Sequence, residues 1–192
     1  MIFKIFWFLR GILYMPFLGK YGFPSYIGKP IYIGNFHRIF LAKRVRIFPG
    51  SRIEVVNNES SIFFKENISI GQNFHVTSAG QLIIGKDTTI AENVMITNID
   101  HEYKEIGVHI LKQPLIFKET KIGENCFIGF GSVIQAGTIL GNHCIVGSNS
   151  VVRGSFPDHC VIVGVPARIV KRYNLSKKVW DRTNPDGTFI EN

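Results

Sequence analysis

The sequence predicts an all-β protein, a parallel β-helix of triangular cross-section, and the prediction rests mainly on residues 122–152. An aliphatic residue recurs there at every sixth position: Ile122, Ile128, Ile134, Leu140, Val146 and Val152. A small residue follows four positions after each of the first five: Cys126, Ser132, Thr138, Cys144 and Ser150. A period of six fits neither a helix nor a simple strand, so the repeating unit is a short strand plus a corner. Repeats of this length are typical of β-helices.

Each coil of such a solenoid has three sides of about six residues and stacks on the next coil at about 4.8 Å. The aliphatic residue of each side points inward. The small residue fits a crowded corner, where a larger side chain would collide with the coils above and below. Because each coil is stabilised mainly by its neighbours, both ends of the solenoid need a cap.

The composition agrees with one turn-rich β domain. The chain has 192 residues, of which 45% are apolar and 19 are glycine, enough for a single domain with a real core. Three cysteines give no even disulfide framework. Cys126 and Cys144 fall at equivalent corners one coil apart, so we interpret them as buried core residues. Reduced cysteines favour a cytoplasmic protein.

The period also suggests how the chain is divided. We place the β-helix at residues 31–170, where the sixfold steps are irregular before Ile96 and regular after Ile122. VVNNESS, residues 55–61, is expected to form a loop between coils. We expect a helical segment at residues 1–30, and a basic tail with a short C-terminal helix at residues 171–192.

Positive charge is concentrated at the N-terminal end. Residues 1–56 contain nine Lys and Arg against one acid, Glu54, whereas the remaining residues contain thirteen of each sign. A pI of ≈ 9.5 can indicate nucleic-acid binding. The basic residues accompany an apolar segment, however, which favours a membrane surface over nucleic acid as the partner.

The opening segment, residues 1–22, is rich in Phe, Trp, Ile and Leu. It has no small-residue cleavage site of the kind that ends a signal peptide. Arg10 and Pro16 interrupt what would otherwise be a transmembrane span. The segment fits a helix that binds peripherally at a membrane interface through its apolar side. It also fits a helix that caps the solenoid. Both interpretations stay open, and one helix can do both.

The aliphatic steps stop after Ile96 and resume only at Ile116. The intervening residues 98–115, NIDHEYKEIGVHILKQPL, are too polar for the interior and are predicted to protrude as a loop. Loops on rigid scaffolds often carry catalytic groups. The titratable candidates in this loop are Asp100, His101, Glu102, Glu105 and His109. The residue pattern alone leaves open whether His101 is a solvated surface residue or a base.

The C-terminal phrase VIVGVPARIVK, residues 161–171, follows IGENCFIGFGSVI and IVGSNSVV. With these motifs, residues 60–173 resemble the hexapeptide-repeat acyltransferases. Within them the chain looks closest to the polysaccharide and O-antigen O-acetyltransferases and to the maltose and galactoside acetyltransferases. The resemblance implies a left-handed β-helix, a homotrimer with active sites between neighbouring prisms, and acetyl-CoA as co-substrate.

The resemblance places the catalytic histidine at the root of the protruding loop, which is His101 here. As a general base it would remove the proton from a sugar hydroxyl, which attacks the acetyl thioester directly. Imidazole, with a pKa of about 6.5, can accept this proton near neutral pH. Asn73 and Asp100 are the acceptor-binding residues that we expect.

The resemblance also assigns the acetyl-CoA site. Gly129 and Gly131 would let the pantetheine arm approach bare backbone, and their N–H groups would stabilise the oxyanion. The phosphates of CoA need cations and hydrogen-bond donors. The remaining expected contacts are Gly147, Ser148, Arg153, Arg168 and Lys171. No metal is expected.

The sequence therefore predicts an O-acetyltransferase acting on a sugar hydroxyl of a surface polysaccharide or its lipid-linked precursor. We expect it in the cytoplasm, with peripheral association at the inner face of the membrane as an open option. Alternatives are an acetyltransferase for a small acceptor and a non-catalytic β-helix scaffold. A zinc-dependent β-helix carbonic anhydrase would need His75, His101 and His109 as ligands, but the last two lie further apart than in that family.

Overall fold

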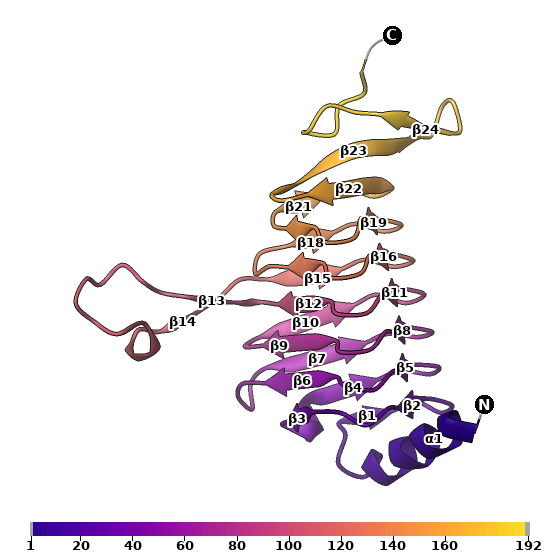
Figure 1. Cartoon of the computed structure of the whole chain (residues 1–192), viewed down its shortest axis with the longest axis vertical. Coiled ribbons are helices and arrows are strands. Elements are labelled where there is room, and N and C mark those ends of the chain that lie inside the picture. The colour runs from indigo at the N-terminus through magenta and orange to yellow at the C-terminus, as the bar shows by residue number, and fades with distance from the viewer. Residues whose placement is uncertain (1, 191–192) are drawn as a thin grey trace.

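The structure, a computed structural model, describes residues 2–190. The chain forms a column of stacked coils with a helix at its N-terminal end, an antiparallel sheet at its C-terminal end and an arm that projects from the middle (Figure 1). This architecture confirms the predicted parallel β-helix.

Within the described residues, parallel strands form the three sides of the prism. Face 1 contains β1 (Lys20–Tyr21), β4 (Ile39–Leu41), β7 (Ser61–Phe64), β10 (Gln81–Ile84), β15 (Thr120–Ile122), β18 (Ile139–Leu140) and β21 (Ser155–Phe156). Face 2 begins with β2 (Tyr26–Ile27), β5 (Arg46–Ile47), β8 (Ser69–Ile70), β11 (Thr89–Ile90), β16 (Phe127–Ile128), β19 (Ile145–Val146) and β22 (Cys160–Gly164). Face 3 contains β3 (Tyr32–Gly34), β6 (Arg52–Val55), β9 (His75–Ser78), β12 (Met95–Thr97), β17 (Val133–Ile134) and β20 (Val151–Val152). A short 3-10 helix, η1 (Phe36–Arg38), connects faces 3 and 1 in the first coil.

The core consists of inward columns, one per face. On face 3 the strand partners Ile96, Ile134 and Val152 lie one above the other and are completely buried. The corresponding columns of the other faces run from Leu41 to Phe156 and from Ile27 to Ile162. The small corner residues are buried too, including Cys126 and Cys144, which are free thiols. The inward assignment of the six-residue steps is therefore confirmed.

The corners explain why asparagine and glycine recur between the strands. Most of them contain a residue with positive φ, a conformation that Asn and Gly tolerate best. At the corner between faces 2 and 3, which we call the 2–3 corner, these residues are Gly50, Asn73, Asn93, Gly131 and Asn149. Their side chains can link successive coils, since the Nδ2 of Asn73 donates to the Oδ1 of Asn93 at 3.1 Å.

The solenoid begins earlier than the predicted residue 31. Helix α1 (Ile2–Tyr14) lies across the end of the column, and β1 starts the first coil at Lys20. Ile27 already belongs to the face 2 column and is 1% exposed. Contacts between α1 and β2 confirm that the N-terminal segment caps the solenoid. None of the helices in residues 2–190 has the length and apolar character needed to span a bilayer.

The predicted short C-terminal helix is wrong. Instead, β23 (Ala167–Asn174), which runs into the expected tail, and β24 (Val179–Arg182) within it add antiparallel strands to β22 on face 2. The chain reverses after Gly164, whose φ of 106 suits glycine. Ala167 and Ile169 alternate with exposed basic residues, so β23 buries one side over the last coil. The last two residues of the predicted tail lie outside the described residues.

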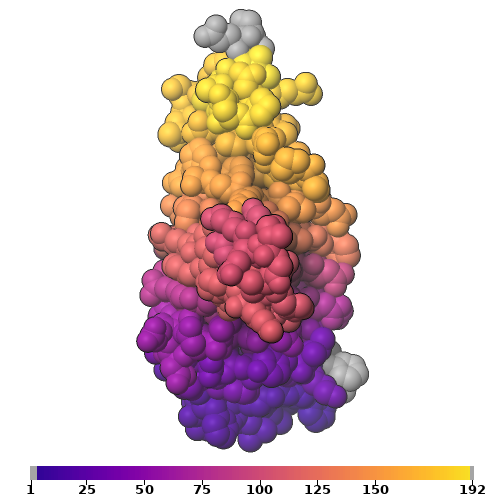
Figure 2. Space-filling model, turned by 90° about the vertical axis from the view of Figure 1, so that its left-hand side faces the viewer, coloured from indigo at the N-terminus to yellow at the C-terminus, as the bar shows by residue number. Residues whose placement is uncertain are grey.

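The predicted protruding loop is confirmed, but it is more ordered than a simple loop. Strands β13 (Ile99–His101) and β14 (Leu115–Phe117) pair antiparallel and leave the prism together. A 3-10 turn, η2 (Ile110–Lys112), lies near the tip. Seen along its own direction, this arm stands out from the middle of the column as a compact knob (Figure 2). The loop expected at residues 55–61 is also present, between β6 and β7.

Candidate active site

The root of the arm is fixed by one buried asparagine. The side chain of Asn98 accepts the N–H of Ala79 at 2.8 Å and donates to the Oγ of Ser78 at 3.0 Å. Its backbone carbonyl accepts the N–H of Lys118, the residue that follows β14, at 3.0 Å. Asn98 is fully buried, so these bonds are shielded from water. Both ends of the arm are thereby attached to the preceding coil.

His101 lies three residues beyond this anchor, at the end of β13, and its side chain is exposed. Ile99 and His101 alternate with Asp100 along the strand, so they project on one side of the arm and Asp100 on the other. The side of the arm that carries His101 faces an open groove of ≈ 430 Å³ on face 3. Glu54, Thr77 and Met95 line its floor, and Leu115 of the arm borders it. The imidazole therefore borders a hollow large enough for a small ligand.

Asp100 projects from the other side of the arm. Its Oδ2 receives the Nζ of Lys118 at 2.7 Å and an Nη of Arg153 at 3.3 Å. The hydrogen bond from Lys118 is the main cause that lowers the pKa of the Asp100 carboxyl. Asp100 thus joins both arm strands to face 3, and we interpret it as a residue that positions the arm. It also lines a second groove of ≈ 260 Å³, between the arm and the later coils.

The tip of the arm is closed by hydrogen bonds of its own. Buried Gln113 donates to the carbonyls of Glu105 and Val108 at 3.1 and 3.0 Å and accepts the N–H of Glu105. The Nδ1 of His109 accepts the N–H of Leu111 at 3.2 Å and so caps the 3-10 turn. His109 therefore has a structural role in the arm, away from the groove beside His101.

The glycines expected to bind acetyl-CoA lie at the 2–3 corner. Their N–H groups are already used within the solenoid: Gly129 donates to Val146, Gly131 to Glu92 and Gly147 to Ile162. Within one subunit, the N–H groups of Gly129 and Gly131 are therefore not free to donate to an oxyanion. A side chain at Gly129 would come within 2.7 Å of the backbone of the next coil, so this glycine is needed for close stacking.

Ser148 differs from its glycine neighbours. Its side chain is exposed, and its N–H makes no hydrogen bond within residues 2–190. Phe130 lies next to it on the coil below and is 45% exposed, and Val163 of β22 is 37% exposed. An unpaired donor between exposed apolar side chains suits a ligand with amide groups and an apolar chain. Among the expected CoA contacts at the 2–3 corner, Ser148 alone leaves its backbone N–H without a hydrogen bond within residues 2–190.

The basic residues expected to bind CoA phosphates separate into two places. Arg153 lies at the corner between faces 3 and 1, the 3–1 corner, where it pairs with Asp100. Arg168 and Lys171 lie on β23 beyond face 2, and both are exposed. The Nη1 of Arg168 donates to the carbonyl of Ala167 at 2.9 Å. The structure thus leaves Arg168 and Lys171 accessible to phosphate and engages Arg153 with the arm.

The expected residues therefore gather at two different corners of the prism. His101, Asp100 and Arg153 lie at the 3–1 corner, whereas Gly129 and Ser148 lie at the 2–3 corner. The two corners are separated by the whole width of face 3, at most about 20 Å for six extended residues. One subunit alone does not bring the histidine and the donor residues together.

Asn73 also lies at the 2–3 corner, before β9, whereas His101 follows the parallel strand β12 at the other end of face 3. Its positive φ of 55 and its bond to Asn93 show that it stabilises the turn. The structure does not bring Asn73 to the groove of its own subunit.

Sequence reasoning missed Glu54, Thr77, Met95 and Lys118. The first three point outward from face 3 because they alternate with the inward residues Ile53, Val76 and Ile96. That alternation was visible in the sequence once the columns were assigned. Lys118 could be recognised only as the first basic residue after the arm. Its pairing with Asp100 requires the two strands of the arm to be in register.

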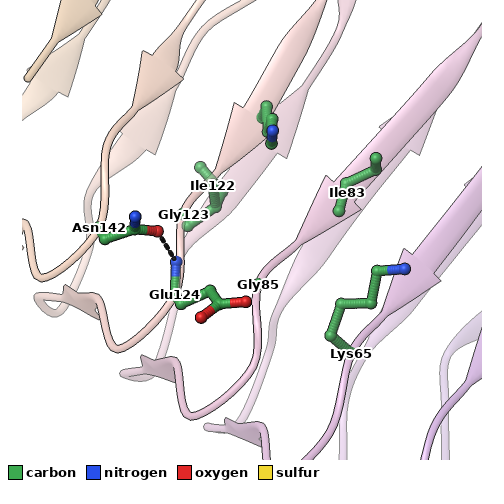
Figure 3. A pocket seen from close by; sticks show the side chains of 8 residues that line it. Lys65, Ile83, Gly85, Ile122, Gly123, Glu124 and Asn142 are labelled. Carbon is green, nitrogen blue, oxygen red and sulfur yellow. Dashed lines mark hydrogen bonds between the residues drawn. The ribbon is translucent and has the colours of Figure 1, made fainter. Parts of the chain in front are cut away.

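Neither a zinc site nor the hollow on face 1 forms part of this site. The histidines considered as zinc ligands do not belong to any group of three or more His, Cys, Asp or Glu that could hold a metal within residues 2–190. A hollow of ≈ 460 Å³ lies on face 1 around Ile83, Lys65 and Glu124 (Figure 3). There the side chain of Asn142 accepts the N–H of Glu124 at 2.9 Å. This hollow contains none of the residues predicted for catalysis or binding.

The fold and the arm define a class: a parallel β-helix of six-residue repeats with a histidine at the root of a projecting arm. Residues 119–154 match the family described as bacterial transferase hexapeptide (six repeats). A protein of Escherichia coli K12, provisionally named a lipopolysaccharide biosynthesis O-acetyl transferase, WbbJ, is 35% identical over 162 residues. The match covers 80% of this chain and 81% of that protein. The chain belongs to the bacterial hexapeptide transferase family.

Solved structures agree with this assignment. The polysialic acid O-acetyltransferase OatWY is 27% identical, with a TM-score of 0.56 over 85% of this chain and 79% of that one. The N-acyltransferase AntD of Bacillus cereus, solved with dTDP and 3-hydroxybutyryl-CoA, has a TM-score of 0.70 at 17% identity, over 88% and 90% of the two chains. The likeness to AntD shows the fold alone.

Proposed function

We propose that this enzyme, an acyl-CoA-dependent acyltransferase by family, transfers the acetyl group of acetyl-CoA to a sugar hydroxyl of a surface polysaccharide or its lipid-linked precursor. The observation that carries the proposal is the position of His101, on a strand anchored by buried Asn98, beside the groove on face 3. Similarity to WbbJ and to a polysialic acid O-acetyltransferase supports an O-linked sugar acceptor.

His101 acts as the general base of this reaction. Its imidazole accepts the proton of the acceptor hydroxyl while the oxygen attacks the thioester carbonyl. The new ester C–O bond forms, the C–S bond breaks, and the proton passes from the imidazolium to the CoA thiolate. General-base assistance of this kind contributes about 10²–10⁴-fold.

The groove beside His101 suits a sugar. Glu54 and Thr77 supply oxygen atoms that can bind sugar hydroxyls, while Met95 and Leu115 supply apolar contact for the ring face. Its ≈ 430 Å³ lies within the range of about 300–1,000 Å³ that small-molecule sites occupy. Because the groove is open, a longer glycan can extend out of it.

The donor site is completed by a second subunit in this proposal. A homotrimer would bring the 2–3 corner of one prism against the arm of its neighbour, in agreement with the separation of the two groups of residues in one chain. Ser148 would then offer its N–H to the pantetheine arm, and Arg168 and Lys171 would bind phosphate. Exposed Phe130 and Val163 support an interface or ligand at this corner.

The proposal places the reaction in the cytoplasm, where reduced thiols and CoA thioesters coexist. Peripheral association through residues 1–22 would bring the enzyme to the inner face of the membrane. A small sugar is the alternative acceptor, because the groove needs only one sugar unit to reach His101. A non-catalytic scaffold is the other alternative, and it predicts no thioester consumption with any acceptor.

A thioester-consumption assay with acetyl-CoA across mono- and oligosaccharides and lipid-linked glycans tests the proposal. We expect turnover with an extended or lipid-linked glycan, and a loss of about 10²–10⁴-fold in His101→Gln with unchanged folding and CoA binding. Thr89→Ala, an exposed substitution on face 2, serves as the matched control. Full activity of His101→Gln would remove the base assignment. The absence of turnover with every acceptor would favour the scaffold.

A further inference from the structure

The two sides of α1 have different surroundings. Its inner side consists of Trp7, Arg10, Gly11 and Tyr14, at the three- and four-residue spacing of one helix face. Trp7 packs on Tyr26 and Phe48 at ring-centroid distances of 5.8 and 5.2 Å. Arg10 donates to the carbonyl of Ile27 at 3.3 Å. This side fully explains how the helix caps the first coil.

The outer side of α1 is apolar and exposed. Ile5, Leu9, Ile12 and Leu13 recur at helical spacing, and with Phe6 they are 37–70% exposed. Met15, Phe17 and Phe23 continue this surface beyond the helix and are 48%, 63% and 65% exposed. We call these eight residues the basal face. Phe17 also packs on Phe36, and Phe23 on Phe8, but capping does not require the solvent-exposed parts of these eight residues to be apolar.

The charge around the basal face has one sign. Five basic residues of the helix and first two coils are exposed: Lys4, Lys20, Lys29, Lys43 and Arg44. The first acid in the sequence is Glu54, which is paired with Arg52. An apolar surface surrounded only by cations is complementary to an anionic lipid surface, which offers acyl chains and phosphates together.

A second copy of the chain is a poorer fit. Two basal faces brought together would place like charges opposite one another without any intervening carboxylate, which is unfavourable. A lipid surface avoids this repulsion because its phosphates neutralise the cations, and its acyl chains also cover the apolar side chains.

We propose that the basal face docks on an anionic membrane surface, so that the solenoid stands on the bilayer with its coils stacked away from it. The helix lies in the interface plane, with its outer side among the acyl chains and lysines at the phosphates. The arm leaves the fourth coil, roughly 15 Å above the first, and α1 adds about 10 Å. If the proposed function holds, the acceptor must span this height, which a lipid-linked glycan of several sugars can do.

Vesicle flotation of the full-length protein tests the proposal directly. We expect binding to phosphatidylglycerol-containing vesicles, weaker binding to pure phosphatidylcholine, and loss of binding at about 0.5 M salt. The double variant Leu9→Gln, Leu13→Gln removes apolar contact at positions that are 50% and 70% exposed. It should lower the partition coefficient by at least about 10-fold. Lys20→Gln and Lys29→Gln should each lower it by roughly 5-fold.

The matched control is Leu175→Gln with Ile190→Gln, which are 73% and 49% exposed. Leu175 lies between β23 and β24 and Ile190 follows β24, so both lie at the antiparallel sheet at the opposite end of the solenoid. This variant should bind vesicles like the unmodified protein. Equal binding by the Leu9, Leu13 variant, or no binding by the unmodified protein, would overturn the proposal. So would a Leu9- and Leu13-dependent increase in mass by light scattering without lipid binding, which would assign the basal face to self-association.

Turnover of a soluble acceptor separates this proposal from the proposed function. We expect the Leu9, Leu13 variant to retain that turnover, because the substitutions lie at the far end of the column from the arm. Failure of vesicle binding with intact turnover would refute the docking surface alone. Vesicle binding without any turnover would support the docking surface and contradict the proposed acetyl transfer.

Discussion

The side chains of the column and of the arm have different surroundings. In the column, inward side chains away from the ends stack between equivalent side chains one coil above and one below, as Ile134 does between Ile96 and Val152. The arm has no such neighbours, and its residues are mostly exposed. Stability and chemistry therefore depend on separate parts of the chain. Substitutions in the column should lower the free energy of unfolding, and substitutions in the arm should lower turnover.

The largest stability effect is expected inside the column. Ile134→Ala removes a fully buried side chain from the middle of the face 3 column and should lower the free energy of unfolding by about 2–5 kcal/mol. The neighbouring change Val133→Ala, on the outward side of the same strand, should cost less than about 1 kcal/mol. Chemical denaturation of both variants measures the difference. Equal costs would contradict the inward and outward assignment.

An intermediate effect is expected where the two regions meet. Asn98→Ala breaks the buried bonds to Ser78 and Ala79 and should cost about 1–3 kcal/mol of unfolding free energy. It should also lower kcat, because the strand that carries His101 loses its anchor. The control is Asn142→Ala, an exposed asparagine that accepts one backbone N–H at a similar distance. Thermal unfolding and steady-state kinetics of Asn98→Ala should therefore change together, and an effect on only one would break the link.

The smallest stability effect is expected at the Asp100 ion pairs. Lys118→Met should change the unfolding free energy by less than about 1 kcal/mol, because the pair is partly exposed. It should nevertheless raise the pKa of Asp100 toward the ordinary value of 3.8, since Lys118 is the main cause of the lowered value. Arg153→Met should raise it less. NMR titration of the Asp100 carboxyl measures both shifts.

The sign of the pH effect follows from the lowered pKa of Asp100. The ion pairs stabilise the folded arm fully above the ordinary carboxyl pKa of 3.8, and this contribution is lost as the pH falls through the lower folded value. When the solution is acidified, the Lys118→Met variant should therefore unfold at a slightly higher pH than the unmodified protein. An unchanged Asp100 titration would show that the pair with Lys118 is not formed in solution.

The column was predictable because its pattern is local. A six-residue step maps directly onto inward positions such as Ile128 and Ile134, and the polar break after Ile96 marked the arm. The C-terminal strands were not predictable in the same way. Residues 167–174 mix apolar and basic side chains without a regular two-residue period, and only pairing with β22 shows that they form a strand.

Part of the site was predictable from the sequence, but its arrangement was not. His101 could be assigned to the arm from the sequence, and the structure places it at the groove. The pairing of Asp100 with Lys118 and Arg153 joins residues 18 and 53 positions apart, which no local pattern shows. Likewise, the N–H of Gly129 is used by the next coil, a fact that depends on the stacking register.

The central claim is that His101 of one subunit works with the 2–3 corner of another. It can be tested by co-expressing His101→Gln with Ser148→Trp, each inactive alone, and measuring turnover of the purified mixed oligomers. If the site is shared between subunits, random mixing restores both intact groups at about one quarter of the sites, and turnover should return to about that fraction. If mixed oligomers form and stay inactive, each site is built from a single chain, and the account is contradicted.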